Sequence, residues 1–488
     1  MKTDSEMRDQ LFFYLNGQKQ QIGGRDAFSM LAPWLRSARG LTGTKIACAH
    51  GACGSCSVLL GRPTQNGFDY QPINACIFPT FACDGAHIIT VEGLNGPDHL
   101  GGQDDGFLSP VQNAMVECHG AQCGFCTPGM VVTLTAFHQQ KRLQSADLKA
   151  EVQSALEGNL CRCTGYSPII EAGTRVESAA LTPLSQLYPA EKLSAGADNS
   201  AEIHVAADEL EGEQHLFAPR SMEEAARWKA QHPSAIVVAG ATEIGVAMSV
   251  KGLAPREILS LARVEGCDEV EIEDGALILG ARANWTKIAR ETREIVPELS
   301  AFLARWGSPQ LRNAGTVAGS VMRASSISDS LPFLLVCEAE LEFLGENGAR
   351  RVPIAEFLEN GPDFYQSELL RRVLAPLPTP NQRLRLFKVS KRRAFDRSIA
   401  SAAFLLTARD GRIEEIKIAC GGVAPSALRL PKTEAFLRGK SLEDATWRAA
   451  GSVAHSEISP LSDAAASREY RLQLVAGLLR KFGGEAQF

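Results

Sequence analysis

The stretch CAHGACGSC, which runs from Cys48 to Cys56, determines the fold expected for the first part of this chain. It presents three cysteines at C-x4-C-x2-C spacing in one loop, separated mainly by alanine, glycine and serine. The segment LFFYLNGQKQQI (11–22) predicts two strands joined at its Asn-Gly pair, because Asn-Gly tolerates the positive φ angles of a tight turn. Further strands are expected around Val58 and Ile88. The cysteine loop therefore lies within a small β-rich unit.

A fourth cysteine, Cys76, follows this loop, and the complete spacing is typical of a plant-type [2Fe–2S] cluster. The small residues leave room for the cluster and let backbone N–H groups approach its sulfurs, which stabilises the more negative reduced state. Zinc is the alternative, but it favours two separated C-x2-C pairs over three ligands in one loop. The predicted ligands are Cys48, Cys53, Cys56 and Cys76.

A second group of cysteines comprises C-G-F-C at 123–126 and C-R-C at 161–163. Thr127-Pro128 after the first pair and Thr164-Gly165 after the second predict helix starts, since a hydroxyl caps a helix and proline favours its first position. The N–H groups and dipole of a helix start favour an anionic thiolate cluster. Zinc stays an alternative, because C-x2-C pairs are common in zinc sites, whereas C-x-C is less usual there. The ligands predicted for a second [2Fe–2S] cluster are Cys123, Cys126, Cys161 and Cys163.

The length, charge and cysteine content of the whole chain restrict the class of protein. The chain has 488 residues, 13 cysteines and a formal net charge of −6, which argues against a nucleic-acid or anionic-membrane partner. No stretch approaches the roughly 20 apolar residues of a membrane span, so a cytoplasmic location is expected. Thiols concentrated in a reducing compartment indicate metal ligation rather than disulfides. Five cysteines stay outside both patterns and are expected to be structural: Cys83, Cys118, Cys267, Cys337 and Cys420.

The two cysteine groups carry a family resemblance. ECHGAQCGFCTPGM (117–130), EGNLCRCTGY (157–166) and CAHGACGSCSV (48–58) are similar to the cluster signatures of the xanthine dehydrogenase and aldehyde oxidase family of molybdenum hydroxylases. The resemblance implies an α+β multidomain fold in the family's order. The implied domains are a β-grasp plant-type ferredoxin domain (1–95), an α-helical [2Fe–2S] bundle (96–178), a linker (179–213), an α/β FAD-binding domain (214–381) and a C-terminal α+β domain (382–488).

Two segments are expected to bind FAD. VVAGATEI (237–244) predicts a strand, a Gly-Ala-Thr turn and a helix start, whose N–H groups can cradle a pyrophosphate, although the pattern alone is a weak signal. The resemblance identifies it with the family's pyrophosphate loop, and LRNAGTVAGSVMRASSISD (311–329) with the second FAD segment. The implied FAD contacts are Val237, Val238, Ala239, Gly240, Ala241, Thr242, Glu243, Ile244, Trp306, Thr316, Val317, Ala318, Gly319, Ser320, Asp329, Leu370 and Lys388.

The second segment departs from the family pattern. Ala318-Gly319-Ser320 replaces Gly-Gly-Asn, Ser326 replaces proline, and Arg323 replaces a small residue. Small residues still permit backbone contacts, so FAD is retained, while the flavin environment and acceptor preference are open. Arg323 is as readily a solvent or interface residue as a cofactor contact. Glu243 is a tentative polar contact near the flavin or the nicotinamide, or a carboxylate that holds the turn.

The resemblance also implies the function. A partner subunit carrying the molybdenum cofactor would hydroxylate hypoxanthine and xanthine to urate, and electrons would pass through the second cluster, the first cluster and FAD to NAD⁺. The implied assembly is a heterotetramer of two small and two large chains, with no purine site in this chain. Aldehydes, nicotinate or another heterocycle are alternative substrates of the partner. A non-enzymatic redox sensor and a zinc-stabilised structural module are the alternatives from other classes.

Overall fold

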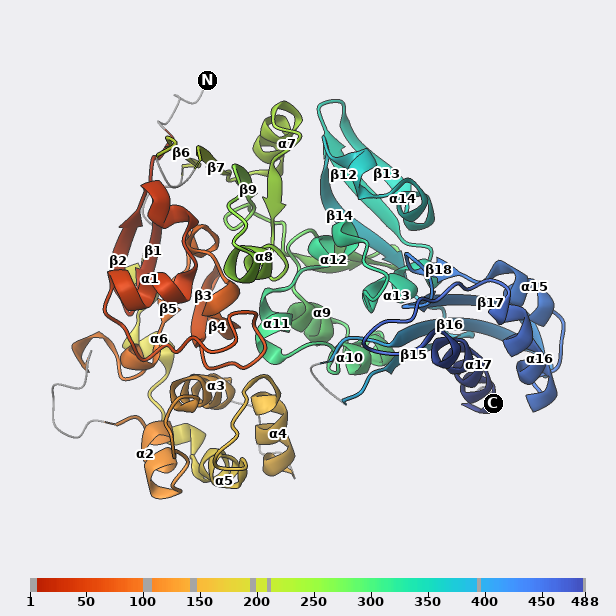
Figure 1. Cartoon of the computed structure of the whole chain (residues 1–488), viewed down its shortest axis with the longest axis horizontal. Helices are drawn as coiled ribbons and strands as arrows, with labels where there is room; N and C mark the ends of the chain where they lie inside the picture. Colours follow the sequence, from red (N-terminus) through yellow and green to blue (C-terminus); the bar gives the residue numbers. More distant parts are fainter. Residues whose placement is uncertain are drawn as a thin grey trace. The chain divides into compact units, whose positions relative to one another are not determined.

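The computed structural model describes residues 7–99, 108–140, 147–193, 199–208, 212–392 and 396–485. The chain folds into two compact units (Figure 1). Unit 1 comprises Met1–Ala225, Ser234–Glu265 and Ser308–Gly315, and unit 2 comprises Ala226–Pro233, Gly266–Gly307 and Thr316–Phe488. Among the described helices, none is long and apolar enough to cross a membrane.

Unit 1 begins with a mixed five-stranded sheet in the order β2-β1-β5-β3-β4. The predicted Asn-Gly hairpin is confirmed, because β1 and β2 pair antiparallel and Asn16 and Gly17 both have positive φ. β1 pairs with β5 in parallel, which gives the predicted β-grasp arrangement. The elements are β1 (Leu11–Leu15), β2 (Gln18–Ile22), α1 (Leu31–Ala38), β3 (Ser57–Thr64), β4 (Gly67–Asn74), η2 (Ala75–Ile77) and β5 (His87–Ile89).

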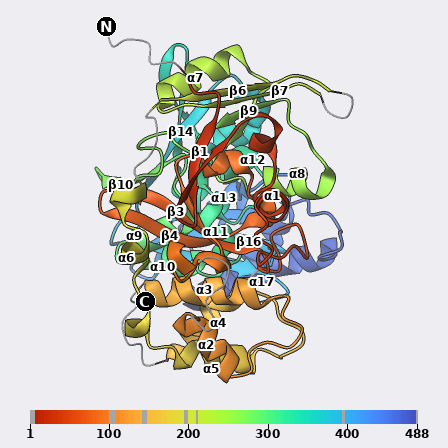
Figure 2. The same ribbon diagram turned by 90° about the vertical axis from the view of Figure 1, so that its left-hand side faces the viewer.

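A group of helices packs beside this sheet through α3, which contacts β3 and β4, while α2 and α4 pack against α3 (Figure 2). Successive side chains of β3 point to opposite faces of the sheet, as the two-residue period of a strand requires. Val58 and Leu60 enter the core that contains α1, whereas Leu59 enters the core that contains α3. The predicted helical region is thus confirmed. The helices are α2 (Pro110–Glu117), α3 (Thr127–Gln139), α4 (Leu148–Ala155), η6 (Leu156–Gly158) and α5 (Ser167–Arg175).

A four-stranded sheet in the order β6-β7-β9-β8 completes unit 1. The segment expected to be a linker contains α6 (Leu184–Leu187) and β6, and β6 pairs antiparallel with β7 along its whole length. The other elements are β6 (Ala201–Val205), β7 (Gln214–Ala218), β8 (Ile236–Val238), α8 (Ile244–Lys251), β9 (Glu257–Ser260) and α11 (Pro309–Ala314). α7 (Met222–Gln231) divides between the units.

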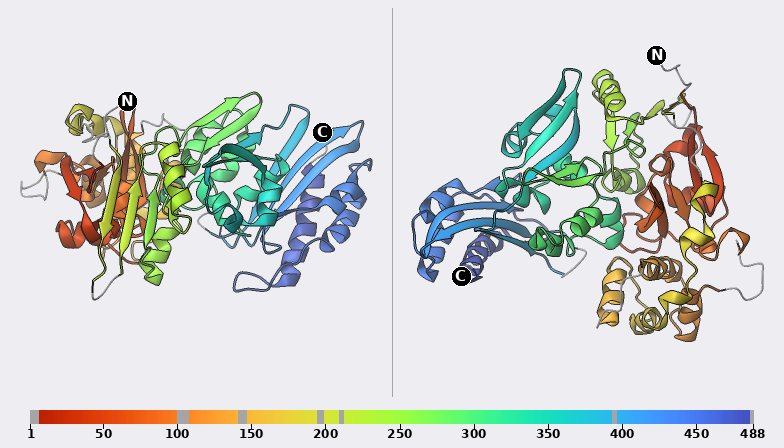
Figure 3. Two further views of the ribbon diagram at one scale, coloured as in Figure 1. Left: turned by 90° about the horizontal axis from the view of Figure 1, so that it is seen from above. Right: turned by 180° about the vertical axis from the view of Figure 1, so that it is seen from behind.

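Unit 2 contains two antiparallel sheets (Figure 3). The first has the order β10-β11-β14-β12-β13 and packs against α12. Its elements are β10 (Val270–Glu273), β11 (Ala276–Gly280), α9 (Trp285–Glu291), α10 (Pro297–Leu303), α12 (Val317–Arg323), α13 (Ser330–Val336), β12 (Glu340–Gly345), β13 (Gly348–Pro353), α14 (Ile354–Asn360) and β14 (Leu369–Pro376).

The second sheet has the order β15-β16-β17-β18 and is covered on both faces. Ala403 and Leu405 of β16 enter the core that contains α13, whereas Phe404 and Leu406 enter the core that contains α16 and α17. The elements are β15 (Gln382–Val389), β16 (Ala400–Arg409), β17 (Arg412–Gly421), β18 (Leu428–Arg429), α15 (Pro431–Leu437), α16 (Asp444–His455) and α17 (Arg468–Glu485). The predicted α+β multidomain class is confirmed.

Candidate redox centres

The first cysteine group lies at one end of the β3–β4 ladder. Cys56 immediately precedes β3 and Cys76 follows β4, and the pairing of Ser57 with Asn74 brings these two ends together. Within the loop, Ala49, Gly51 and Gly54 all have positive φ, which bends the backbone around the thiols. The N–H of Ala52 donates to Cys48 Sγ at 3.2 Å, which is the kind of contact that stabilises a thiolate.

The thiols of this group interact with one another. A hydrogen bond with Cys48, followed by burial, raises the pKa of Cys53 to about 12. For Cys76, the hydrogen bond with Cys48 lowers the pKa, but a hydrogen bond with Cys56 and burial outweigh it and raise the pKa overall. Because a thiol binds metal as the thiolate, binding of a cluster would release the protons of Cys53 and Cys76.

The second cysteine group joins the start of α3 to the loop before α5. Cys123 Sγ lies 3.6 Å from Cys163 Sγ, and Cys161 Sγ lies 4.0 Å from Cys163 Sγ. Burial, with a hydrogen bond to Cys161, raises the pKa of Cys126 to about 12, whereas a backbone hydrogen bond at Cys123 lowers the pKa of Cys163. The four predicted thiols therefore lie close enough together to affect the pKa of Cys126 or of Cys163, although Cys123 and Cys163 are 40 residues apart in the sequence.

The helix caps differ from the prediction. Cys126 itself occupies the N-cap of α3, and Thr127 is the first helical residue, with a buried Oγ1 that has no partner among the described residues. Thr164 does not cap α5 either, because its Oγ1 accepts from the N–H of Tyr166, which is the N-cap. The prediction that Cys126 stands at a helix start holds, and the hydroxyl caps were wrong because α3 already includes Thr127 and α5 begins only at Ser167.

The cysteines excluded from both groups are buried, as expected. Cys83, Cys267, Cys337 and Cys420 are at most 4% exposed, and Cys118 is 8% exposed. Burial raises the pKa of the Cys83 thiol above its usual range, which keeps it protonated and inert.

The two cysteine groups are linked by direct hydrogen bonds. The N–H of Leu160, next to Cys161, donates to the carbonyl of Cys53 at 2.9 Å. Asn159 Nδ2 donates to the carbonyl of Gly54 at 3.1 Å. A single hydrogen bond therefore connects Cys53, a predicted ligand in the first group, to Leu160, the residue before the predicted second-group ligand Cys161.

A buried glutamine supports this link. Gln310 of α11 is 0% exposed, and its Nε2 donates to Asn159 Oδ1 at 2.8 Å and to Ser57 and Thr133 hydroxyls at 3.3 Å. Its Oε1 has no partner among the described residues. Sequence reasoning missed Gln310 and Asn159. Ser308 caps α11, but a local cap does not specify the distant partners of Gln310.

We expect Gln310→Met to lower the free energy of unfolding of the loaded protein by about 1–3 kcal/mol. The change keeps the side chain's length but leaves buried acceptors without their amide donor. Urea unfolding followed by the visible absorbance of the clusters measures it. Gln186→Met, on the short surface helix α6, is the control, and an equal loss there would contradict the role of Gln310.

Close packing at Gly129 gives a second expected result. A Cβ at Gly129 in α3 would lie 2.1 Å from the carbonyl oxygen of Gly54. Gly129→Ala should therefore destabilise the protein by about 1–3 kcal/mol through overpacking, although alanine normally favours a helix. Gly477→Ala in α17, where a Cβ meets nothing within 4 Å, should be neutral or stabilising. Thermal unfolding of both variants tests this, and equal melting temperatures would contradict it.

The first predicted FAD segment lies in unit 1 between β8 and α8. Val238 is buried, Val237 is 37% exposed, and Ala241 adopts the left-handed conformation with φ of 62°. Glu243 is the exposed N-cap of α8 without a side-chain cap bond. The strand–turn–helix form predicted here is confirmed.

The same segment rests on the first cysteine group. A Cβ at Gly245 would lie 1.8 Å from the carbonyl oxygen of Ile77, so α8 contacts the backbone directly beside Cys76. Glycine is required at this position because of that approach. The predicted pyrophosphate loop and a predicted cluster ligand are thus in adjoining elements of one unit.

The second predicted FAD segment lies in unit 2. Thr316 caps α12, with its Oγ1 accepting from the N–H of Gly319, while the N–H groups of Val317 and Ala318 donate to carbonyls of Ala283 and Ala281. These amides are already bonded within the protein. Contacts to a cofactor from this segment would therefore come mainly from side chains and from the exposed Gly319 and the half-buried Ser320.

The hydroxyls of this segment form a cluster. Ser320 Oγ lies 2.7 Å from Ser328 Oγ and 2.9 Å from Ser330 Oγ. Ser320, which replaces the family's asparagine, thus bonds to its own segment. Arg323 is exposed at the end of α12, where a solvent role fits as well as a cofactor contact.

The remaining predicted contacts lie in unit 2. Asp329 is buried, and its carboxylate accepts from Lys388 Nζ at 2.7 Å and from the Ser398 hydroxyl. Leu370 is 5% exposed on β14, within the core. Asp329 and Lys388, predicted separately, form one buried ion pair.

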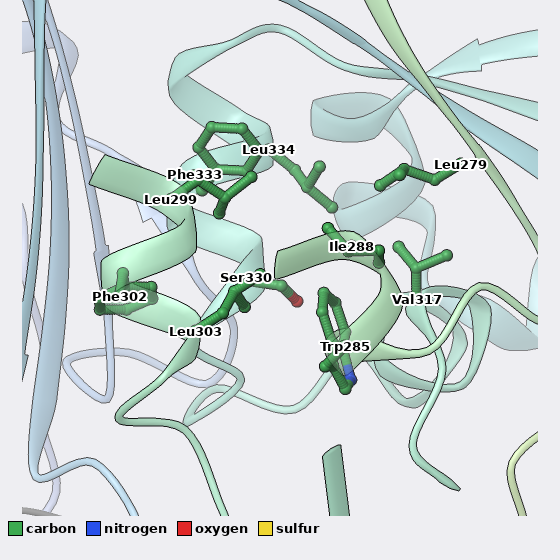
Figure 4. A pocket seen from close by; sticks show the side chains of 10 residues that line it. All are labelled: Leu279, Trp285, Ile288, Leu299, Phe302, Leu303, Val317, Ser330, Phe333 and Leu334. Atoms are coloured by element: carbon green, nitrogen blue, oxygen red, sulfur yellow. The ribbon is translucent and has the colours of Figure 1, made fainter. Parts of the chain in front are cut away.

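Trp306 contacts Trp285, which is one of the residues that line an apolar pocket in unit 2 (Figure 4). Its ring centroid is 4.0 Å from that of Trp285, which lines the pocket with Val317 and Phe333. Ser330 supplies a hydroxyl to the lining. Val317, in the second predicted FAD segment, lines this pocket, and Trp306, the predicted aromatic contact, packs against Trp285 of the same lining.

Three family models match the chain in succession. They are the [2Fe-2S] binding domain over residues 90–174, the FAD binding domain in molybdopterin dehydrogenase over 210–378, and the CO dehydrogenase flavoprotein C-terminal domain over 385–486.

Curated relatives and solved structures agree with these matches. Xanthine dehydrogenase 1 of Arabidopsis thaliana is 28% identical over 99% of this chain and 40% of its own length, and aldehyde oxidase 1 of Bos taurus is 29% identical over 97% and 39%. The chain spans about two fifths of these relatives. Quinoline 2-oxidoreductase from Pseudomonas putida 86 gives a TM-score of 0.51 at 25% identity, covering 55% of this chain and 95% of that chain. Carbon monoxide dehydrogenase from Hydrogenophaga pseudoflava gives 0.51 at 22%, covering 55% and 94%.

The fold, the thiol groups and the domain matches define an iron–sulfur flavoprotein with [2Fe–2S] and FAD domains. The chain matches the iron–sulfur and FAD subunit of the molybdenum hydroxylase family, and its curated relatives include xanthine dehydrogenases and aldehyde oxidases.

Proposed function

We propose that this chain is the electron-transfer part of a xanthine dehydrogenase. A partner subunit with the molybdenum cofactor hydroxylates hypoxanthine and xanthine to urate, and this chain conveys the electrons to NAD⁺. When bound, each [2Fe–2S] cluster carries one electron and FAD exchanges one or two, which connects one-electron transfer with hydride transfer.

The observation that supports this most strongly is the contact between neighbouring binding loops. The Leu160 N–H bonded to the Cys53 carbonyl joins the second thiol group to the first, and Gly245 packed on Ile77 joins the first group to the predicted FAD loop. Asn159 and Gln310 hold the first of these contacts in place. The donors fit their groups, since the four thiols of each group interact with one another and four thiolates are the ligand set that a [2Fe–2S] cluster takes.

Roles of individual residues follow from this arrangement. The ligands would be Cys48, Cys53, Cys56 and Cys76 for one cluster, and Cys123, Cys126, Cys161 and Cys163 for the other. The segments 237–244 and 316–320 would hold FAD. Glu243, exposed at the start of α8, is proposed as a polar contact to the flavin or nicotinamide.

An anaerobic absorbance titration with NADH tests the proposal. Joint bleaching of the flavin and cluster bands is expected, because electrons that enter at the flavin should reach both clusters. If these bands stay oxidised while dithionite reduces them, NAD⁺ is not the acceptor. If neither reagent changes the spectrum of an iron-containing protein, the relay itself is wrong.

Substrate choice is tested on the complete complex. Turnover of hypoxanthine supports the purine proposal, and turnover of aldehydes or quinoline without purine turnover contradicts it. The structural likeness to quinoline 2-oxidoreductase makes the heterocycle the alternative to examine first.

Sedimentation of the same complex tests the proposed heterotetramer, and cell fractionation tests the proposed cytoplasmic location. The domain bounds 1–95, 96–178, 214–381 and 382–488 likewise stay proposals.

A further inference from the structure

Two histidines and a glutamate meet on one face of the β6–β7 ladder in unit 1. His204 of β6 pairs directly with His215 of β7, and Glu202 lies two residues before His204 on the same strand. Since side chains two apart on a strand share a face, and directly paired residues do as well, all three project to one side. None of the predicted cluster or FAD residues is among them.

Their ligand atoms are already close. One nitrogen from each imidazole and one carboxylate oxygen all lie within 4.8 Å of one another. His215 Nε2 lies 2.8 Å from Glu202 Oε1, and His204 Nε2 lies 3.8 Å from the same oxygen. The two imidazole rings stack at 3.9 Å between centroids. Zinc binds imidazole nitrogen and carboxylate oxygen at about 2.0–2.2 Å, so side-chain rotations would bring these three atoms onto one ion.

We propose that Glu202, His204 and His215 bind one divalent transition-metal ion of the Zn²⁺ class. Two imidazoles and one carboxylate form a donor set that suits zinc and its neighbours rather than calcium or magnesium, which take oxygen ligands. With three protein ligands, water completes the tetrahedral coordination.

The burial of the three groups suits such a site. The side chains of His215 and Glu202 are 13% and 20% exposed, so packing holds them in place, while that of His204 is 62% exposed and gives an ion access from solvent. The bound ion links β6 to β7. It thereby fixes the strand that follows the helical cluster domain to the sheet that carries the predicted pyrophosphate loop, since β8 belongs to the same sheet.

The experiment uses the iron- and flavin-loaded protein incubated with a small excess of Zn²⁺ and passed through a desalting column. We expect one zinc atom retained per chain, with the iron content unchanged, so that zinc has not displaced a cluster. Competition with a chromophoric chelator then gives the affinity. His204→Ala, His215→Ala and Glu202→Gln should each weaken it by about tenfold or more.

Two comparisons keep the result decisive. His455→Ala, which removes an exposed histidine of unit 2, should retain zinc like the unchanged protein. Glu202→Gln keeps the shape of the site, so a loss of zinc in this variant with normal flavin and iron content cannot be attributed to misfolding. No retained zinc, or equal affinity in the unchanged protein and all three site variants, would overturn the proposal.

Discussion

Lys388→Met is expected to lower the free energy of unfolding by about 3–5 kcal/mol. Lys388 and Asp329 form an ion pair at 2.7 Å in which both side chains are only 2% exposed. Removing the ammonium leaves a carboxylate buried with only the Ser398 hydroxyl as its described side-chain donor, and a buried charge without its counter-ion is strongly destabilising. Denaturant unfolding followed by circular dichroism measures the loss.

The double variant Lys388→Met with Asp329→Asn is the control for this prediction. It removes both charges and leaves an amide oxygen that can still accept from Ser398, so most of the stability should return. A double variant as unstable as the single one would show that the lysine acts through packing and not through its charge. Flavin content measured on the same samples tests the predicted cofactor role of both residues independently of stability.

Cys161→Ser should halve the iron content of the purified protein and remove one of its two [2Fe–2S] signals in electron paramagnetic resonance. Cys161 is buried, with its Sγ 4.0 Å from Cys163 Sγ, and serine binds iron far less readily than a thiolate. NADH should still reduce the flavin, because the first thiol group and the predicted FAD loop are untouched.

Cys118→Ser is the matched control, since Cys118 belongs to the same helical core but is excluded from the ligands. It should keep both signals and its full iron content. Loss of a cluster in Cys118→Ser with retention in Cys161→Ser would reverse the assignment. Zinc in place of iron in the unchanged protein would favour the zinc alternative for the second group.

The sequence by itself determined the local chemistry. The C-x4-C-x2-C loop, the Asn-Gly hairpin, the cysteine pair before α3 and the strand–turn–helix at 237–244 each depend on spacing, small residues and turn propensity within a few neighbours. Such information is contained in short segments, which explains why the fold class, the hairpin and the strand–turn–helix were predicted correctly, while the cluster ligands stay predictions. The predicted caps at Thr127 and Thr164 were wrong, because a shift of one or two residues in the start of a helix changes which side chain stands at its N-cap.

Only the tertiary structure decided which distant groups meet. Gln310 reaches Asn159 across 151 residues, Lys388 reaches Asp329 across 59, and Gly245 rests on Ile77. The β6–β7 register likewise turns three separate side chains into a candidate metal site. No local pattern specifies these pairs, because each depends on how sheets and helices pack, and packing is set by the apolar faces of whole elements rather than by the polar residues that they bring together.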